Sequence, residues 1–261
     1  TVYQKGAEVI RMLATLLGRE CFRQGSDLYF QRHDGLAATT ENFIAAMEFT
    51  SGRDLSQFKR WYSQAGTPRV AINGQYDAES KQFVITVKQT CPTTPENPEK
   101  KSFHLPLVMS LIGQKNALPL YLKPATDDKN HPKQLQGHHT MTLEVTEPEQ
   151  TFIFEQINEK PVPSLFQDFS APVKWSYDYS NEDLALILRV DTNDFCRWEA
   201  SQILWTNIIH QAMRDLRLGN APEVPDEIIT LYHELLKQVE NKPNTTQALV
   251  TQLLTLPSEE Y

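Results

Sequence analysis

The hydrophobic pattern of the chain changes at residues 58–68, which read Phe58-Lys59-Arg60-Trp61-Tyr62-Ser63-Gln64-Ala65-Gly66-Thr67-Pro68. Before this stretch, apolar residues recur at the three- and four-residue spacing of amphipathic helices. After it, short β-branched or alternating runs are separated by turn-forming residues, which is typical of strands. Gly66-Thr67-Pro68 therefore marks an expected boundary between a helical segment and a β-rich segment.

Four helices are expected on the N-terminal side of this boundary, in residues 1–66. Gly18 stands where the first helix would end, and Thr39 is a favourable N-cap for the third. Asp54 and Gln57 have the spacing of a capping box, so the fourth helix is expected to begin at Asp54.

About seven short strands are expected beyond Pro68. They are Val70–Ile72, Phe83–Thr90, Leu105–Ile112, Leu118–Leu122, Thr140–Val145, Thr151–Phe154 and Lys174–Tyr177. Either Asn73-Gly74 or Asp77–Lys81 could turn the first hairpin. The second is preferred, because the first would leave only a stub of strand before the turn. Short strands with irregular turns predict a small, immunoglobulin-like β-sandwich.

Helical spacing returns near Ser180, which has Asp183 three residues later as a capping partner. An amphipathic stretch over 194–218 ends at Gly219. Further helices are expected over 226–240 and 246–256. Such a series resembles the start of a helical array, in which each unit needs a neighbour to cover it. The sequence thus predicts an α+β, multi-domain fold: a helical segment, an all-β immunoglobulin-like sandwich, then an α-helical array.

Composition limits the class of protein and of partner. The 261 residues are 40% hydrophobic and 22% charged, as in soluble proteins with real cores. The net charge of −8 argues against a nucleic-acid partner, which would need clustered Lys and Arg. The longest apolar runs fall far short of the ~18 residues of a membrane span. Cys21, Cys91 and Cys196 form no CxxC pair and indicate thiols in a reducing compartment, so a cytoplasmic location is expected.

Common site motifs do not identify a chemistry. The sequence contains no nucleotide-binding loop, no nucleophile elbow and no His-Glu-x-x-His motif. Only His131, His138 and His139 cluster, and a metal site there would need a further ligand on rigid structure, so no metal ligands are expected in the chain. Arg32-His33-Asp34-Gly35 could contain a catalytic His–Asp pair, but a helix C-terminus followed by a turn is preferred.

Five stretches resemble, in order, segments of the zinc aminopeptidases of the aminopeptidase N family. The first resembles the family's Y-E-K-G-A motif and reads Thr1-Val2-Tyr3-Gln4-Lys5-Gly6-Ala7-Glu8-Val9-Ile10. The others are Tyr29–Gly35, Phe58–Pro68, Phe169–Val173 and Asn193–Ala200. They span essentially the whole chain, and five separated matches in order are not expected by coincidence.

The resemblance implies a four-domain exopeptidase that releases N-terminal residues from peptides with one catalytic zinc. The family's zinc ligands lie upstream of the matched region, so this chain alone is expected to be inactive, and Thr1 is expected to lie inside a domain. The resemblance divides the chain into residues 1–66, the C-terminal helical half of the catalytic domain, residues 67–172, the β-sandwich, and residues 173–261, the start of the C-terminal helical domain.

One catalytic role carries over from the family, and it falls on Tyr3. The family's tyrosine at this place donates its O–H to the oxyanion that forms when water attacks the scissile carbonyl. A phenol remains protonated at neutral pH and can therefore donate without carrying charge. A packing role is the alternative for Tyr3. Gln4 departs from the family's usual Glu, and since it keeps the size and the hydrogen bonding, tuning is expected rather than loss of function.

A different class of function also fits the pattern. The β-sandwich could act as a stand-alone protein-interaction module with no catalytic role. A degenerate, non-catalytic homologue is disfavoured because Tyr3 is retained. In either case the apolar faces of residues 1–65 and of the helices after Gly219 would lack neighbours, so self-association of the chain is expected.

Overall fold

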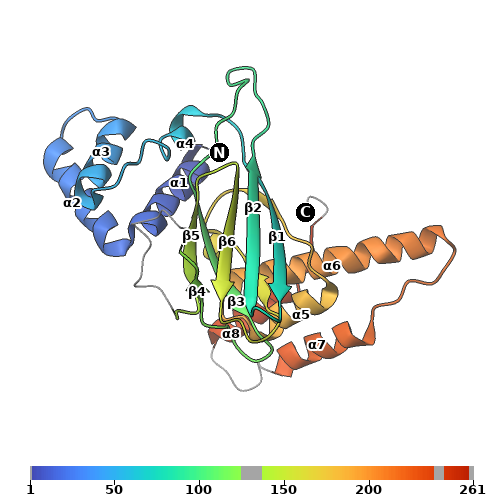
Figure 1. Cartoon of the computed structure of the whole chain (residues 1–261). Coiled ribbons are helices and arrows are strands. Elements are labelled where there is room, and N and C mark those ends of the chain that lie inside the picture. Colours follow the sequence, from blue (N-terminus) through green and yellow to red (C-terminus); the bar gives the residue numbers. More distant parts are fainter. Residues whose placement is uncertain (1, 125–136, 238–243, 259–261) are drawn as a thin grey trace.

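The computed structural model describes residues 2–124, 137–237 and 244–258, and three groups of elements follow one another in this part of the chain (Figure 1). The first group is helical. It contains α1 (Val2–Leu17), α2 (Arg19–His33), α3 (Thr40–Ser51) and the single turn α4 (Arg60–Ser63). Gly18 separates the first two helices with a φ of 78°, a conformation that glycine adopts without strain.

The second group consists of strands. They are β1 (Arg69–Asp77), β2 (Gln82–Thr90), β3 (Leu105–Ile112), β4 (Tyr121–Leu122), β5 (Met141–Val145), β6 (Glu149–Glu155), β7 (Val162–Ser164) and β8 (Lys174–Ser176). They form one sheet in the order β4-β6-β2-β1-β8 and a second in the order β5-β3-β7. Side chains from both sheets, such as Ile85 and Leu107, share one core. The expected sandwich is therefore confirmed.

The third group is helical again. It contains α5 (Asn181–Val190), α6 (Asp194–Arg217), α7 (Asp226–Lys237) and α8 (Asn244–Leu253). The Ser180 side chain accepts a hydrogen bond from the Asp183 backbone, and the two form the expected capping box. Gly219 follows α6 with a φ of 81°, as expected for a helix end. The predicted helix over 226–240 extends into residues 238–240, which lie outside the described part of the chain.

The turn of the first hairpin lies at the position preferred from the sequence, Asp77–Lys81. Asp77 pairs with Gln82, so the turn lies over residues 78–81 and Asn73-Gly74 lies inside β1. The Asp77 carboxylate accepts hydrogen bonds from the backbone N–H of Glu79 at 2.9 Å and from the Ser80 hydroxyl at 2.6 Å. This turn chemistry explains the choice, because an Asp side chain can bond the backbone two residues on.

Two parts of the pattern were misjudged. The strand β7 was not expected, because three residues that include Pro163 show no alternation. The fourth helix does not begin at Asp54; the only helical turn in that stretch is α4. Gln57 does not serve in a capping box, because its amide donates instead to the carbonyls of Thr146 at 2.6 Å and Ser102 at 3.3 Å.

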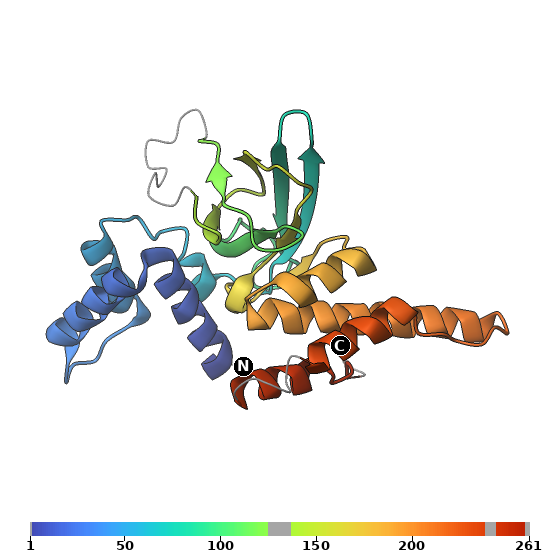
Figure 2. The same cartoon turned by 90° about the horizontal axis from the view of Figure 1, so that it is seen from below.

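The first and last strands of the sandwich, β1 and β8, are neighbours at one edge of the larger sheet. The last strand, β8, pairs in parallel with β1, with Arg69 opposite Lys174. The backbone N–H of Lys174 also donates to the carbonyl of Pro68 at 2.9 Å. The N-terminal helices lie to one side of the sandwich and α5–α8 to another, with the second half of α6 projecting beyond the sheets (Figures 1 and 2).

The N-terminal helices and the sandwich share a continuous core. Buried residues of α1 and α3, such as Leu13 and Met47, belong to the same cluster as Leu105 and Val145 of the second sheet. A separate cluster joins α5–α8 and includes Val162 of β7. Burial of apolar surface therefore fixes α1 against the sandwich.

Candidate functional site

Tyr3, the expected catalytic residue, lies in the first turn of α1 with 93% of its side chain exposed. The opposite face of the helix is buried. The buried residues recur at helical spacing and are Val9, Met12, Leu13 and Leu16. The Tyr3 side chain lies outside this core, so its hydroxyl is exposed at the start of a helix whose opposite face is buried.

The start of α1 is tied to the boundary between helices and strands. The Lys5 ammonium donates to the carbonyl of Gly66 at 3.0 Å and lies 6.0 Å from the centre of the Trp61 ring. Gly66 has a φ of 109°, and a Cβ there would lie 2.7 Å from the Cys91 sulfur. Only glycine therefore suits position 66. Its carbonyl accepts the hydrogen bond of Lys5, which lies two residues after Tyr3 in α1.

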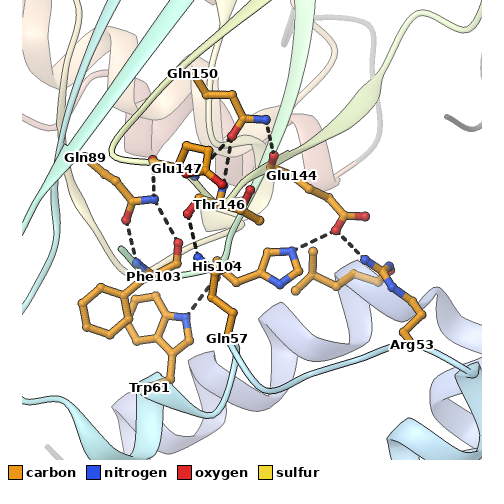
Figure 3. A network of polar contacts seen from close by, with 11 residues as sticks. Arg53, Gln57, Trp61, Gln89, Phe103, His104, Glu144, Thr146, Glu147 and Gln150 are labelled. Atoms are coloured by element: carbon orange, nitrogen blue, oxygen red, sulfur yellow. Dashed lines mark hydrogen bonds and ion pairs between the residues drawn. The ribbon is translucent and has the colours of Figure 1, made fainter. Parts of the chain in front are cut away.

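The C-terminal end of α1 is held by Arg53. Its guanidinium donates to the carbonyl of Leu16 at 2.8 Å, one of the carbonyls that a helix leaves unpaired at its end. A cation at this end is also favoured by the helix dipole. The same guanidinium forms an ion pair with Glu144 of β5 (Figure 3). Both ends of α1 are thus bonded to residues beyond the helix itself.

A network of polar contacts joins α4 and the segment before it to the sandwich (Figure 3). The Trp61 indole donates to the carbonyl of His104 at 3.0 Å, and its ring lies 4.5 Å from that of Phe103. The Gln89 side chain holds Phe103 in turn, accepting from its backbone N–H at 2.8 Å and donating to its carbonyl at 2.9 Å. These bonds satisfy buried backbone groups that no strand partner reaches.

The other motifs that resemble the family are structural in this chain. His33 ends α2 and stacks near Tyr29, with ring centres 5.5 Å apart. Asp34 follows as the C-cap, so the preferred interpretation of a helix end is confirmed. The two later motifs meet in space, because the rings of Phe169 and Phe195 lie 5.8 Å apart.

The described residues do not provide a zinc site. Within residues 2–124, 137–237 and 244–258, no three His, Cys, Asp or Glu side chains are placed to hold a metal ion. His138 and His139 belong to this part, whereas His131 lies outside it. None of the helices in the same ranges is long and apolar enough to cross a membrane. The three cysteines are free thiols.

The most perturbed titratable groups lie between the sandwich and α6. Burial raises the pKa of Glu199 to about 7, against a hydrogen bond from the Trp175 side chain that lowers it. Burial also raises the pKa of Cys196 and of Tyr179. The cavity that these residues line measures about 10 Å³, which is room for a single water at most. They therefore form a packed contact rather than a substrate site.

The sequence predicted Tyr3 as the catalytic residue, which stays a prediction, and gave no sign of the residues that hold its helix. Lys5 lies inside the first motif, yet nothing there shows that its partner is Gly66. Arg53 lies in no motif. In both cases the bonded carbonyl is far away along the chain, 61 residues for Lys5 and 37 for Arg53. A single sequence carries no signal for such contacts.

Three family models match the chain in order. They are the peptidase family M1 domain at residues 1–62, a domain of unknown function with an Ig-like fold (DUF3458) at residues 66–178, and a domain of unknown function with ARM repeats (DUF3458_C) at residues 181–261. The expected succession of an immunoglobulin-like sandwich and a helical array is confirmed. The division at 66/67 and 172/173 stays a prediction.

Individual proteins agree with these matches. Aminopeptidase N of Escherichia coli K12 is 41% identical over 259 residues, and that of Haemophilus influenzae is 41% identical over 263. Each match covers 99% of this chain and 28% of the relative, so the chain spans under a third of their length. Among solved structures, Legionella pneumophila aminopeptidase A in complex with aspartic acid matches 99% of this chain and 27% of its own, with a TM-score of 0.77 and 28% identity. Three models follow one another in order, and the match to the bacterial aminopeptidases N extends over 99% of this chain, so nearly the whole chain is similar to one part of those enzymes and its first 62 residues match the peptidase family M1 domain.

Proposed function

We propose that this chain is part of a zinc-dependent aminopeptidase that releases N-terminal residues from peptides. The observation that carries the proposal is the place of Tyr3: it lies within the M1 match, at the exposed first turn of a helix whose two ends are bonded elsewhere. A catalytic donor needs both properties, access to substrate and a fixed support.

In this proposal Tyr3 acts as a hydrogen-bond donor. When water adds to the scissile carbonyl, negative charge develops on the carbonyl oxygen, and the Tyr3 O–H stabilises it. Because the donor is neutral and its helix is bonded at both ends, it costs little reorganisation at the moment of reaction. Gln4 lies next to Tyr3 and would tune substrate binding without taking part in the reaction.

The zinc ion is proposed to be held by residues outside this chain, because the described residues offer no ligand set. Its chemistry would be activation of the attacking water. The proposed location is the cytoplasm, since Cys21, Cys91 and Cys196 are all unpaired. Cell fractionation with an antibody to the chain would test the location.

A stand-alone interaction module is less well supported. The core of the sandwich continues into α1 and α3, so the sandwich would expose apolar surface if it were released from them.

The test is Tyr3→Phe in the full-length protein. We expect kcat to fall by ~10²–10³ with zinc content unchanged, because one oxyanion donor is lost and the metal ligands are untouched. Arg23→Ala, which breaks an exposed ion pair with Asp27 on α2, serves as the control and should leave kcat unchanged. A loss confined to KM would count against the proposed role.

A further inference from the structure

Arg11 of α1 forms a fork onto the backbone of the sandwich. Its guanidinium donates to the carbonyl of Asp168 at 2.7 Å and to the carbonyl of Phe169 at 2.9 Å. The Arg11 Nε also donates to the Glu8 carboxylate at 2.9 Å, one helical turn back. Glu8 therefore orients the guanidinium, and two of its N–H groups meet two successive carbonyls. Arginine is suited to such two-point contacts because its donors lie in a rigid plane.

The backbone that Arg11 contacts has an unusual conformation. Phe166, Asp168 and Phe169 have φ values of 51°, 54° and 55°. Residues with a side chain seldom adopt this left-handed region, and such residues persist only where the surrounding structure holds them. Here the conformation brings the carbonyls of Asp168 and Phe169 to the same guanidinium. The short helix η2 (Gln167–Phe169) is thus shaped around its contact with α1.

The same loop contacts the C-terminal helices from its other side. The Asn193 amide donates to the Asp168 carboxylate at 2.9 Å, and the Asn193 side-chain oxygen caps α6 by accepting from the Cys196 N–H at 3.0 Å. The Phe169 ring lies 5.8 Å from that of Phe195 in α6 and 5.7 Å from the Arg11 guanidinium. One loop thereby connects α1, the sandwich and the first turn of α6.

We propose that Arg11 is a positioning residue for Tyr3: its fork onto Asp168 and Phe169 sets the register of α1 against the sandwich and α6. The proposal rests on the proposed function of Tyr3. Arg11 lies eight residues after Tyr3 in α1, a distance of ~12 Å at 1.5 Å per residue. A tilt or shift of α1 at Arg11 therefore moves Tyr3 as well. A misplacement of about 1 Å can cost roughly 10²-fold in rate.

The test uses the full-length protein and the variants Arg11→Ala and Arg11→Lys. Arg11 has a side chain that is 45% exposed, so these changes leave the core intact. We expect kcat to fall at least ~10-fold for Arg11→Ala with KM within about twofold, and to fall less for Arg11→Lys, which keeps a cationic donor group but not the planar, two-point contact of the guanidinium. The control Arg23→Ala also removes an exposed arginine from a helix and should keep the original kcat.

A double-mutant cycle separates positioning from stability. If Arg11 acts through Tyr3, Arg11→Ala causes no further fall in kcat once Tyr3→Phe is present. Equal falls in both backgrounds, or an unchanged kcat with only a lower Tm, would overturn the inference. If Arg11→Ala does not fold, Arg11→Lys is carried through the same cycle. Should Tyr3→Phe alone leave kcat unaltered, the proposed function fails, which is a distinct result from additive effects.

Discussion

The Nε2 atom of His104 lies 2.9 Å from the carboxylate of Glu144, which also pairs with Arg53 (Figure 3). His104 is buried at the start of β3, Glu144 belongs to β5, and Arg53 comes from the N-terminal segment. Burial alone would raise the pKa of Glu144, but hydrogen bonds from His104 and Arg53 hold it below its ordinary value. The ionised carboxylate is therefore the form that joins the helical segment to the sandwich.

Replacing Glu144 with Gln should destabilise the fold by about 1 kcal/mol at pH 7, a modest value because the Glu144 side chain is 40% exposed. Since the folded pKa lies below the ordinary 4.5, this contribution is present above that pH and is lost as the pH falls through the folded value. Urea unfolding at several pH values would show the two proteins converging in acid. Glu149→Gln, from an exposed pair with Lys88, is the control. A difference that does not shrink as the pH falls below 4.5 would contradict the assignment.

Glu199 should show the opposite pH dependence. Its folded pKa of about 7 lies above the ordinary 4.5, so the stability that it contributes is complete below 4.5 and lost as the pH rises through 7. We expect Glu199→Gln to stabilise the chain by about 1–3 kcal/mol at pH 8 and to have little effect at pH 4.5. Unfolding of both proteins across this range would test it, with Glu223→Gln in the exposed segment before α7 as the control. Equal stability of Glu199→Gln and the original chain at pH 8 would refute the prediction.

The chain by itself should bind no stoichiometric zinc and hydrolyse no peptide. Tyr3 is present, but the oxyanion donor that it is proposed to be does not activate water by itself, and the described residues hold no ligand set. Metal analysis of the purified chain and an alanyl chromogenic substrate would test both statements. About one tightly bound zinc per chain, or activity that co-purifies with it, would show that residues of this chain form a metal site.

Self-association is expected through exposed apolar helix faces. In α7, which follows Gly219, Ile229 and Leu236 are 44% and 43% exposed, seven residues apart on one face. Changing both to Lys should lower the apparent mass measured by light scattering, because the apolar stripe is then charged. Hydrogen exchange should find residues 67–172 the most protected unit. A strictly monomeric original chain would rule out this expectation.

Regular, local patterns in the sequence predicted much of the fold. The strand β3 begins and ends where expected, and the boundary of β2 differs by one residue, because both are long apolar or alternating runs. Elements decided by distant partners could not be predicted. The strand β7 exists because β3 pairs with it, with Ser110 opposite Ser164. The expected fourth helix does not begin at Asp54, because the Gln57 amide donates to carbonyls of distant residues instead of capping it.

The candidate site shows the same difference between features set by local sequence and features set by distant contacts. Tyr3 could be proposed because it lies in a local motif, and its exposure at a helix start agrees with the spacing of the buried face. The role proposed for Arg11 could not be predicted. In the structure Arg11 pairs with Glu8 three residues away, but its contact with Asp168 joins residues 157 positions apart. Such a contact exists only once the chain has folded.

The parallel pairing of β8 with β1 implies an order of events during folding. Bringing Lys174 beside Arg69 closes a loop of roughly a hundred residues, and the entropic cost of closure rises with loop length. The hairpin of β1 and β2 closes only over residues 78–81 and can form at an early stage. We therefore expect β8 to be the last strand added to its sheet, after the hairpin of β1 and β2 has formed.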